Sequence, residues 1–232
     1  MNVQFLGMSL YGVVVAVAIS ILFAELAGYI LHRVMHSERF TILSRTHLIH
    51  HLQLYGPTDA MRADAYKNAT DGRTSLGNIG MEWVLPSVAI LGGCWLALWG
   101  WGIGWGYQLL VMSTLLGWPL FMFSYLHDRM HLKNFWMERA PLLRIWFKKA
   151  RRLHDVHHRS LNDDGIMNRN FGIGFFFFDR AFGTLAKRHR AMNWRGYRSA
   201  IRRHRANSVS EEERLASGMT RRVPHSYLLR GR

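Results

Sequence analysis

The stretch that decides the fold is residues 83–126, WVLPSVAILGGCWLALWGWGIGWGYQLLVMSTLLGWPLFMFSYL, a run of 44 residues without a single Asp, Glu, Lys or Arg. A membrane-spanning helix needs about 20 apolar residues, so this run is long enough for two. Its middle reads GWGIGWG at 100–106. Glycines relax the backbone there, and tryptophans favour a membrane interface. We therefore predict two spans that fold back on each other, in preference to a buried core helix.

A second apolar run, residues 8–31, contains one charge, Glu25, and predicts a further span. It lacks the preceding basic cluster of a signal peptide and is too long for one, so we interpret it as an uncleaved anchor. Six Lys and Arg lie from Arg33 to Arg73 and 24 from Arg129 to Arg232. With three spans all 30 fall on one side, which the positive-inside rule identifies as the cytoplasm. The predicted fold is all-α: a membrane domain of about three spans with a cytoplasmic helical cap.

Ten of the 13 histidines form two matching sets, and each set reads H-x-x-x-H and then H-x-x-H-H. On a helix, residues i and i+4 lie on one face about 5–6 Å apart, so such a pair can share one ion. Adjacent histidines diverge by about 100°, so one can serve one metal and its neighbour a second. The predicted ligands of this two-metal site are His32, His36, His47, His50, His51, His127, His131, His154, His157 and His158.

Ten imidazoles exceed the four ligands of a tetrahedral zinc and suit two redox metals, although imidazole binds iron, copper, nickel and zinc alike. The other histidines, His189, His204 and His225, lie among arginines and are expected at the solvated surface. The single cysteine, Cys94, argues against a disulfide framework or a C-x-x-C site. Because no GxGxxG or P-loop occurs either, the chain shows no electron-carrying module of its own.

The spans deliver both H-x-x-x-H pairs to the same membrane edge, and the remaining elements of the cap follow from local pattern. A short helix is predicted over 44–54, ended by Tyr55-Gly56-Pro57. Residues 135–149 are basic and amphipathic, so we expect them in the plane of the membrane interface. The four phenylalanines of 175–178 favour packing at the membrane surface over lining a substrate route.

From Lys187 onward the composition changes, with 13 Lys and Arg against three Glu. We therefore divide the chain into a membrane domain, 1–186, and a basic cytoplasmic C-terminal tail, 187–232. Such a tail attracts anionic lipid headgroups at about 1 kcal/mol per basic residue near the surface, and an acidic electron donor is another candidate partner. Attachment to a membrane favours lipid over nucleic acid.

The order of the four histidine boxes, followed by N-F-G at 170–172 and D-R-x-F-G-T at 179–184, resembles the fatty acid hydroxylase/sterol desaturase superfamily of integral-membrane di-iron enzymes. The resemblance runs from about His32 to Thr184. It implies that the ten box histidines bind two iron ions, that O2 is the oxidant, and that a C–H bond of a lipid, such as a fatty-acyl chain or sterol, is hydroxylated or desaturated. It also implies a separate electron donor of ferredoxin or cytochrome b5 type.

Beta-carotene hydroxylases are relatives of this superfamily, but their first and third boxes usually have one more intervening residue, which disfavours a carotenoid substrate. Ligation by histidine alone leaves a metal site cationic, so hydrogen-bond acceptors that orient the rings should matter. The candidates for this role are Asp128, Asp155, Asn168, Asn170 and Glu25. For the aspartates the alternative is an ion pair with nearby arginines, and for Glu25 it is an interhelical hydrogen bond.

Three rival functions fit the pattern less well. A membrane metal transporter would place its ligands near the bilayer midplane, a zinc hydrolase of the common type would contain H-E-x-x-H, and a di-haem cytochrome would hold its histidines inside the spans. The sequence therefore predicts a non-haem di-iron lipid hydroxylase or desaturase, with a membrane metal-binding or transport protein as the alternative from another class.

Overall fold

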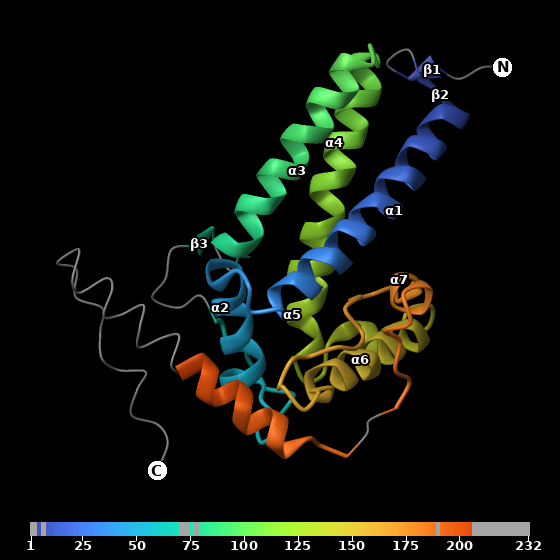
Figure 1. The fold of residues 1–232 in the computed structure, drawn as a ribbon. Helices are drawn as coiled ribbons and strands as arrows, with labels where there is room; N and C mark the ends of the chain where they lie inside the picture. The colour runs from blue at the N-terminus through green and yellow to red at the C-terminus, as the bar shows by residue number, and fades with distance from the viewer. Residues whose placement is uncertain (1–3, 6–7, 70–74, 77–78, 189–190, 206–232) are drawn as a thin grey trace.

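Three long helices form a bundle, and the helices that carry most of the histidines form a cap at one end of it (Figure 1). The long helices are α1 (Leu10–Met35), α3 (Met81–Gly100) and α4 (Trp105–Pro119). The computed structural model describes residues 4–5, 8–69, 75–76, 79–188 and 191–205. The helical membrane architecture predicted from the sequence is confirmed.

Three helical segments are long and apolar enough to cross a membrane: Leu10–Met35, Trp83–Gly100 and Trp105–Met130. The last two lie side by side and are joined by a tight turn at 101–104 (Figure 1), where Gly102 has a φ of +67° that favours glycine. The prediction of three spans, with the last two folded back at the glycine-rich turn, is therefore confirmed.

The third span changes its helical geometry just before it delivers its histidines. Helix α4 continues into a π-helical segment, η2 (Leu120–Leu126), and then into α5 (His127–Met130). Wider π-helical turns are rare and are frequent at functional sites. Here the wider turn comes directly before His127 and alters which side of the helix that histidine occupies.

Helix α1 approaches the third span closely, because Gly28 faces the ring of Phe123 and a Cβ at that glycine would collide with it. One turn earlier, Trp118 Nε1 donates a 2.7 Å hydrogen bond to the buried carboxylate of Glu25. The interhelical hydrogen bond expected for Glu25 is thus confirmed. Both contacts set the position of His32, which follows Gly28 by about one turn.

The cap consists of short helices around the lower ends of α1 and the third span (Figure 1). The helix predicted at 44–54 is present, although it begins at Thr41 and becomes π-helical at His50. The cap elements are α2 (Thr41–Ile49), η1 (His50–Leu54), η3 (Trp136–Glu138), α6 (Arg144–Arg159) and α7 (Phe177–Ala181). Four short strands pair as two antiparallel hairpins: β1 (Gln4–Phe5) with β2 (Met8–Ser9), and β3 (Ser75–Leu76) with β4 (Ile79–Gly80).

The amphipathic stretch 135–149 has one face in the protein core. Phe135 and Phe147 are buried against side chains of η2 and α5. On the other face Leu142 is 94% exposed and Ile145 73% exposed. Large apolar side chains with that much exposure suit an apolar surrounding better than water, so the predicted position at a membrane interface stays a prediction with structural support.

The chain after Lys187 does not leave the cap at once. Residues 194–205 form a helix that packs against α2 and η1 through a core that includes Ala200 and Leu52 (Figure 1). Arg203 donates to Glu38 at 2.9 Å. His204 is buried, so the expectation of a solvated histidine is wrong there, because the packed face of this helix includes it. His189, His225 and residues 206–232 lie outside the described residues.

Candidate metal centre

Nine of the ten box histidines converge in two groups. Within each group, the candidate ligand nitrogens all lie within 4.8 Å of one another. All nine side chains are buried. We call these the first group and the second group. The first group is His32, His36, His47, His51 and His157, and the second group is His50, His131, His154 and His158.

The groups do not follow the order of the chain, because His50 and His157 cross between the two sets of boxes. In each H-x-x-H-H run, the histidines four residues apart stay in one group and the middle one joins the other. Adjacent histidines such as His50 and His51 therefore face different groups, as their angular separation predicts. The rings of His51 and His158 are 3.9 Å apart, so the two groups are neighbours.

The Nε2 atoms in each group are crowded around a common point. In the first group, His36 Nε2 lies 2.9 Å from His47 Nε2 and 3.0 Å from His157 Nε2. In the second group, His154 Nε2 lies 3.0 Å from His131 Nε2 and 3.1 Å from His158 Nε2. Nitrogens that each bind one ion at about 2.1 Å come about this close to each other. The spacing therefore fits ligands that share an ion.

Several ring nitrogens in the cluster are buried without any protein partner. Among the described residues, the Nε2 atoms of His32, His50, His51 and His127 have no hydrogen-bond partner. Burying a polar nitrogen unpaired costs free energy, and a metal ion would remove that cost. Burial, followed by the neighbouring histidines, lowers the pKa of His36, His47 and His154 well below the usual value. Burial also lowers the pKa of His157, to about 4. Neutral imidazole is the form that binds metals.

The tenth histidine, His127, lies beside the second group. Its ring centroid is 4.7 Å from that of His50 and 4.9 Å from that of His154. Its Nδ1 atom faces the Asp128 carboxylate at 3.3 Å. All ten predicted ligands therefore lie in one cluster, with five in the first group and four plus His127 in or beside the second.

Backbone carbonyls orient two rings of the first group. His32 Nδ1 lies 2.6 Å from the carbonyl of Phe171, and His157 Nδ1 lies 2.6 Å from that of Arg169. A carbonyl only accepts hydrogen bonds, so each Nδ1 donates and each Nε2 has a free lone pair. This is how metal-binding histidines are normally held.

The fatty acid hydroxylase family matches residues 17–184 of this chain. The chain belongs to that family. The match runs from within α1 to the residue that ends the D-R-x-F-G-T motif, so it includes all ten histidines. No curated protein and no solved structure matches the chain significantly.

In this fatty acid hydroxylase family chain, Asn170 shapes the loop that supplies both carbonyls. Asn170 is fully buried, and its φ of +56° lies in the left-handed region that Asn tolerates best after Gly. Its amide donates to the carbonyls of Leu153 and Ala186 at 2.9 and 2.8 Å, and its oxygen accepts from the Ala186 N–H. None of these three hydrogen bonds goes to a histidine, so Asn170 orients the rings through the carbonyls on either side of it.

Asp179 supports the same loop and was not among the candidates from the sequence. Its buried carboxylate accepts 2.7 Å hydrogen bonds from the N–H groups of Phe171 and Gly172 and from the Thr184 hydroxyl. Burial raises the pKa of Asp179, and these hydrogen bonds oppose the rise. The D-R-x-F-G-T motif was the signal that could have identified it.

The other candidate acceptors occupy different places. Asp155 forms an ion pair with Arg62 at 2.7 Å, which is the alternative expected for it. Arg62 also donates a hydrogen bond to the Met61 carbonyl. That carbonyl lies 3.3 Å from His131 Nδ1. Asp128 contacts His127 directly. Asn168 is exposed, and its described contact is a backbone hydrogen bond to Ser160.

A cavity of about 240 Å³ joins the histidine cluster to the spans. Its inner end is formed by His32, His47, His50 and His127. Most of its remaining wall is apolar and comes from α3, α4 and η2; it includes Val84, Leu91, Leu115, Leu116, Leu120 and Phe123. Tyr66, Asn68 and Asp128 add polar groups near the histidines. The sequence did not predict this cavity, because the histidines at its inner end and the apolar residues of α3, α4 and η2 come from separate parts of the chain.

Proposed function

We propose that this chain is an O2-dependent, non-haem di-iron enzyme that hydroxylates or desaturates a membrane lipid, such as a fatty-acyl chain or sterol. The observation that supports this most directly is the apolar cavity that ends on histidines of both groups. An apolar pocket with a few polar groups at one end positions an apolar chain and presents one part of it to those groups. Membership of the fatty acid hydroxylase family supports the same proposal.

The cavity opens sideways, toward the surface of the spans. Val88, Leu116 and Leu120 line the cavity and are also 63%, 50% and 42% exposed. These side chains lie on helices that are long and apolar enough to cross a membrane. We infer that a lipid chain moves between α3 and α4 directly from the bilayer, without passing through water.

The histidine groups would hold two iron ions, one in each group. Imidazole suits iron, and the unpaired Nε2 atoms and their 2.9–3.1 Å spacing fit such ions. Iron would supply the reduction of O2 that attack on an unactivated C–H bond requires. The chain's own residues bind the metals, orient the imidazoles through the loop around Asn170, hold the lipid chain in the cavity and keep water from the site.

The proposed orientation follows the distribution of basic residues. The cap and the C-terminal segment would face the cytoplasm, where a separate donor of ferredoxin or cytochrome b5 type would supply electrons. The basic residues after 187 would add attraction to anionic headgroups.

The test is lipid mass spectrometry of cells that express the chain, its His157→Ala variant or its His204→Ala variant, with and without O2. His204 is the matched control, because it is a buried histidine outside both groups. We expect a lipid that gains one oxygen or loses two hydrogens with the unchanged chain and with His204→Ala, but not with His157→Ala or without O2. Equal product from the His157→Ala variant would overturn the proposal.

A second experiment tests the cavity. Leu116→Trp places a larger side chain in the cavity wall, whereas Leu96→Trp makes the same change on an exposed span position outside the wall. We expect Leu116→Trp to lower product formation about tenfold or to change the preferred lipid, and Leu96→Trp to have little effect. An equal loss of product formation in both variants would mean that the cavity does not bind the reacting lipid.

A further inference from the structure

Helix α6 has a histidine face and a basic face on opposite sides. Its buried side includes His154 and His158 of the second group and His157 of the first. Its other side is exposed and carries a row of basic residues four to seven positions apart, with Lys149 beside it. We call this row the α6 basic face: Arg144, Lys148, Lys149, Arg152 and Arg159.

Helix α6 stands between both histidine groups and the surface of the cap. An α-helix with its side chains is about 10 Å across, so a molecule bound to the α6 basic face lies about one helix away from both groups. No residue of α6 lines the described cavity. The lipid and a partner on α6 would therefore approach the metal centre from different sides.

The proposed reaction needs a partner of this kind. Hydroxylation consumes a C–H bond, O2, two electrons and two protons, and it yields an alcohol and one water. Neither the lipid nor O2 supplies the two electrons, and the described residues include no electron carrier other than the proposed metal centre itself. This requirement rests on the proposed function.

We propose that the α6 basic face is the docking surface for an acidic one-electron carrier protein. Complementary charge steers such partners and speeds their association. The acidic residue within the face, Asp155, is already paired with Arg62, so it adds little repulsion to an acidic partner. Asp163 and Asp164 follow the C-terminal end of α6 and mark the limit of the basic surface there.

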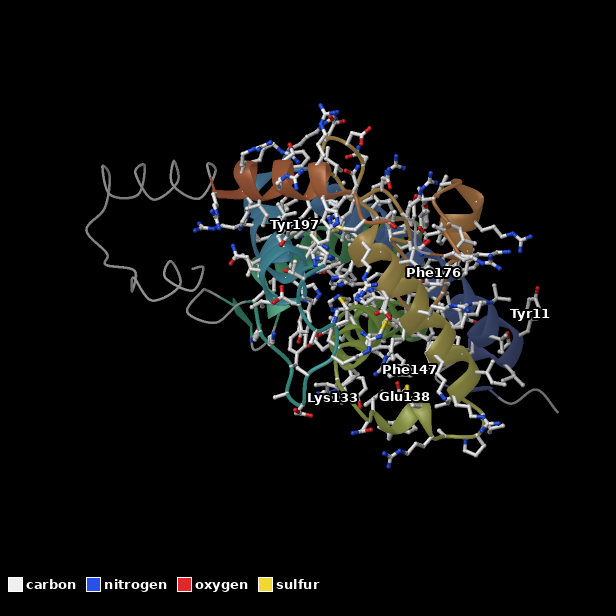
Figure 2. The ribbon with its side chains drawn as sticks, turned by 90° about the horizontal axis from the view of Figure 1, so that it is seen from below. Tyr11, Lys133, Glu138, Phe147, Phe176 and Tyr197 are labelled. Atoms are coloured by element: carbon white, nitrogen blue, oxygen red, sulfur yellow. The ribbon has the colours of Figure 1, made fainter. Side chains whose placement is uncertain are left out.

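The position of α6 favours a protein over lipid headgroups. Helix α6 lies at the end of the molecule away from the turn between α3 and α4 (Figure 1), and in the view from below it runs across the cap (Figure 2). The exposed apolar residues near its start, Leu142 and Ile145, mark the end of α6 that would meet a membrane surface. Lys148 and Lys149 follow Ile145 by about one helical turn, whereas Arg152 and Arg159 lie about two and four turns beyond it, so the α6 basic face extends away from that end.

The test uses a charge-reversed variant, Lys148→Glu with Lys149→Glu and Arg152→Glu. The matched control carries the same change of charge on the exposed side of the 194–205 helix: Arg195→Glu with Arg198→Glu and Arg202→Glu. The probes are a plant-type [2Fe–2S] ferredoxin and cytochrome b5. Their dissociation constants for the full-length protein are measured in neutral detergent at several salt concentrations, which requires no turnover.

We expect the α6 variant to bind the better of the two probes at least about tenfold more weakly, and the control within about twofold of the unchanged protein. Binding should weaken with added salt in the unchanged protein and much less in the α6 variant. Equal binding by the α6 variant and the control would overturn the proposal, as would failure of both probes to bind the unchanged protein. An effect that appears only in anionic-lipid vesicles would assign the face to lipid and also overturn it.

Turnover with dithionite as a chemical electron source separates this proposal from the proposed function. We expect product from the unchanged protein, the control and the α6 variant alike, since dithionite needs no docking surface. If even the unchanged protein forms none when loaded with iron, the proposed function fails, while the binding result still decides the docking proposal. If only the α6 variant forms no product, both binding and dithionite turnover are measured again with a milder variant. That variant is Lys148→Gln with Lys149→Gln and Arg152→Gln, and the outcomes above apply to it unchanged.

Discussion

The first histidine group is oriented by one loop, whereas the second is oriented by contacts from several parts of the cap. Two 2.6 Å bonds to the carbonyls on either side of Asn170 hold rings of the first group. In the second group, His158 and His131 face carbonyls at 3.2 and 3.3 Å, and His50 faces the Tyr66 hydroxyl at 3.4 Å. Shorter hydrogen bonds hold a ring more strictly, so His32 and His157 are held more firmly than the rings of the second group.

The groups also differ in how many ligands each can lose. Five nitrogens converge in the first group and four in the second, with His127 at its side. After the loss of one histidine the first group still offers four imidazole nitrogens, whereas the second offers three and His127 beside them. The comparison predicts that loss of one histidine releases metal more readily from the second group than from the first.

The largest effect should come from removing a ligand. His154→Ala in the second group and His47→Ala in the first should each lower product formation at least about a hundredfold, which exceeds most losses from residues that only orient ligands. Metal analysis of purified protein should show a greater loss of bound metal for His154→Ala. An equal loss of metal in the two variants would contradict the predicted difference in metal retention between the groups.

The next effect concerns the loop that holds the first group. Asn170→Ala loses three side-chain hydrogen bonds and strains a backbone with a φ of +56°. We expect product formation to fall about 10- to 100-fold, with metal lost mainly from one site. Glycine adopts this backbone conformation without strain but also lacks the hydrogen bonds. Asn170→Gly should therefore be more active than Asn170→Ala and less active than the unchanged protein. Full recovery would assign the role of Asn170 to backbone conformation alone.

A smaller effect is expected where the second group is supported by a side chain. Tyr66→Phe removes the hydroxyl that lies 3.4 Å from His50 Nδ1 and contacts Asp128. Because this contact is long, product formation should fall about threefold to tenfold, less than in Asn170→Ala. Steady-state product formation at matched metal content measures the difference. A larger loss than in Asn170→Ala would reverse the order of rigidity.

The smallest effect should come from Glu25, which belongs to neither group. Glu25→Gln keeps an acceptor oxygen for Trp118 Nε1, so activity should stay within about twofold. Glu25→Leu leaves that indole N–H unpaired and should lower the free energy of unfolding by about 1–3 kcal/mol, measured by thermal unfolding in detergent. A large loss of metal in Glu25→Gln would instead connect this carboxylate to the metal centre.

Pattern and spacing were sufficient for much of the fold and for the membership of the cluster. The uncharged run 83–126 predicted the hairpin of spans, because 44 residues without a charge are enough for two membrane-spanning helices and too many for one buried core helix. Spacing of three and four along helices predicted which histidines can share a metal. It did not predict that His50 and His157 would cross between the groups, since that depends on how α6 packs against α1 and η1.

Residues that act through the backbone were the hardest to predict. Asn170 was named as a candidate, yet its role lies in the carbonyls beside it. Asp179 was quoted within a motif and given no role, although it binds two N–H groups of the same loop. Hydrogen bonds to backbone atoms leave no residue pattern of their own, so a sequence shows the side chain and not its partner.

The amino-acid sequence by itself determined that this chain has three apolar spans, that its basic residues and histidine boxes lie at or beyond their ends, and that the histidines are spaced for two metals. These are properties of composition and helical period, which act over short distances along the chain. Only the tertiary structure decided which histidines meet, which carbonyls orient them, and where the cavity lies. Those depend on close packing between segments as distant as α1 and the loop around Asn170, which local sequence does not encode.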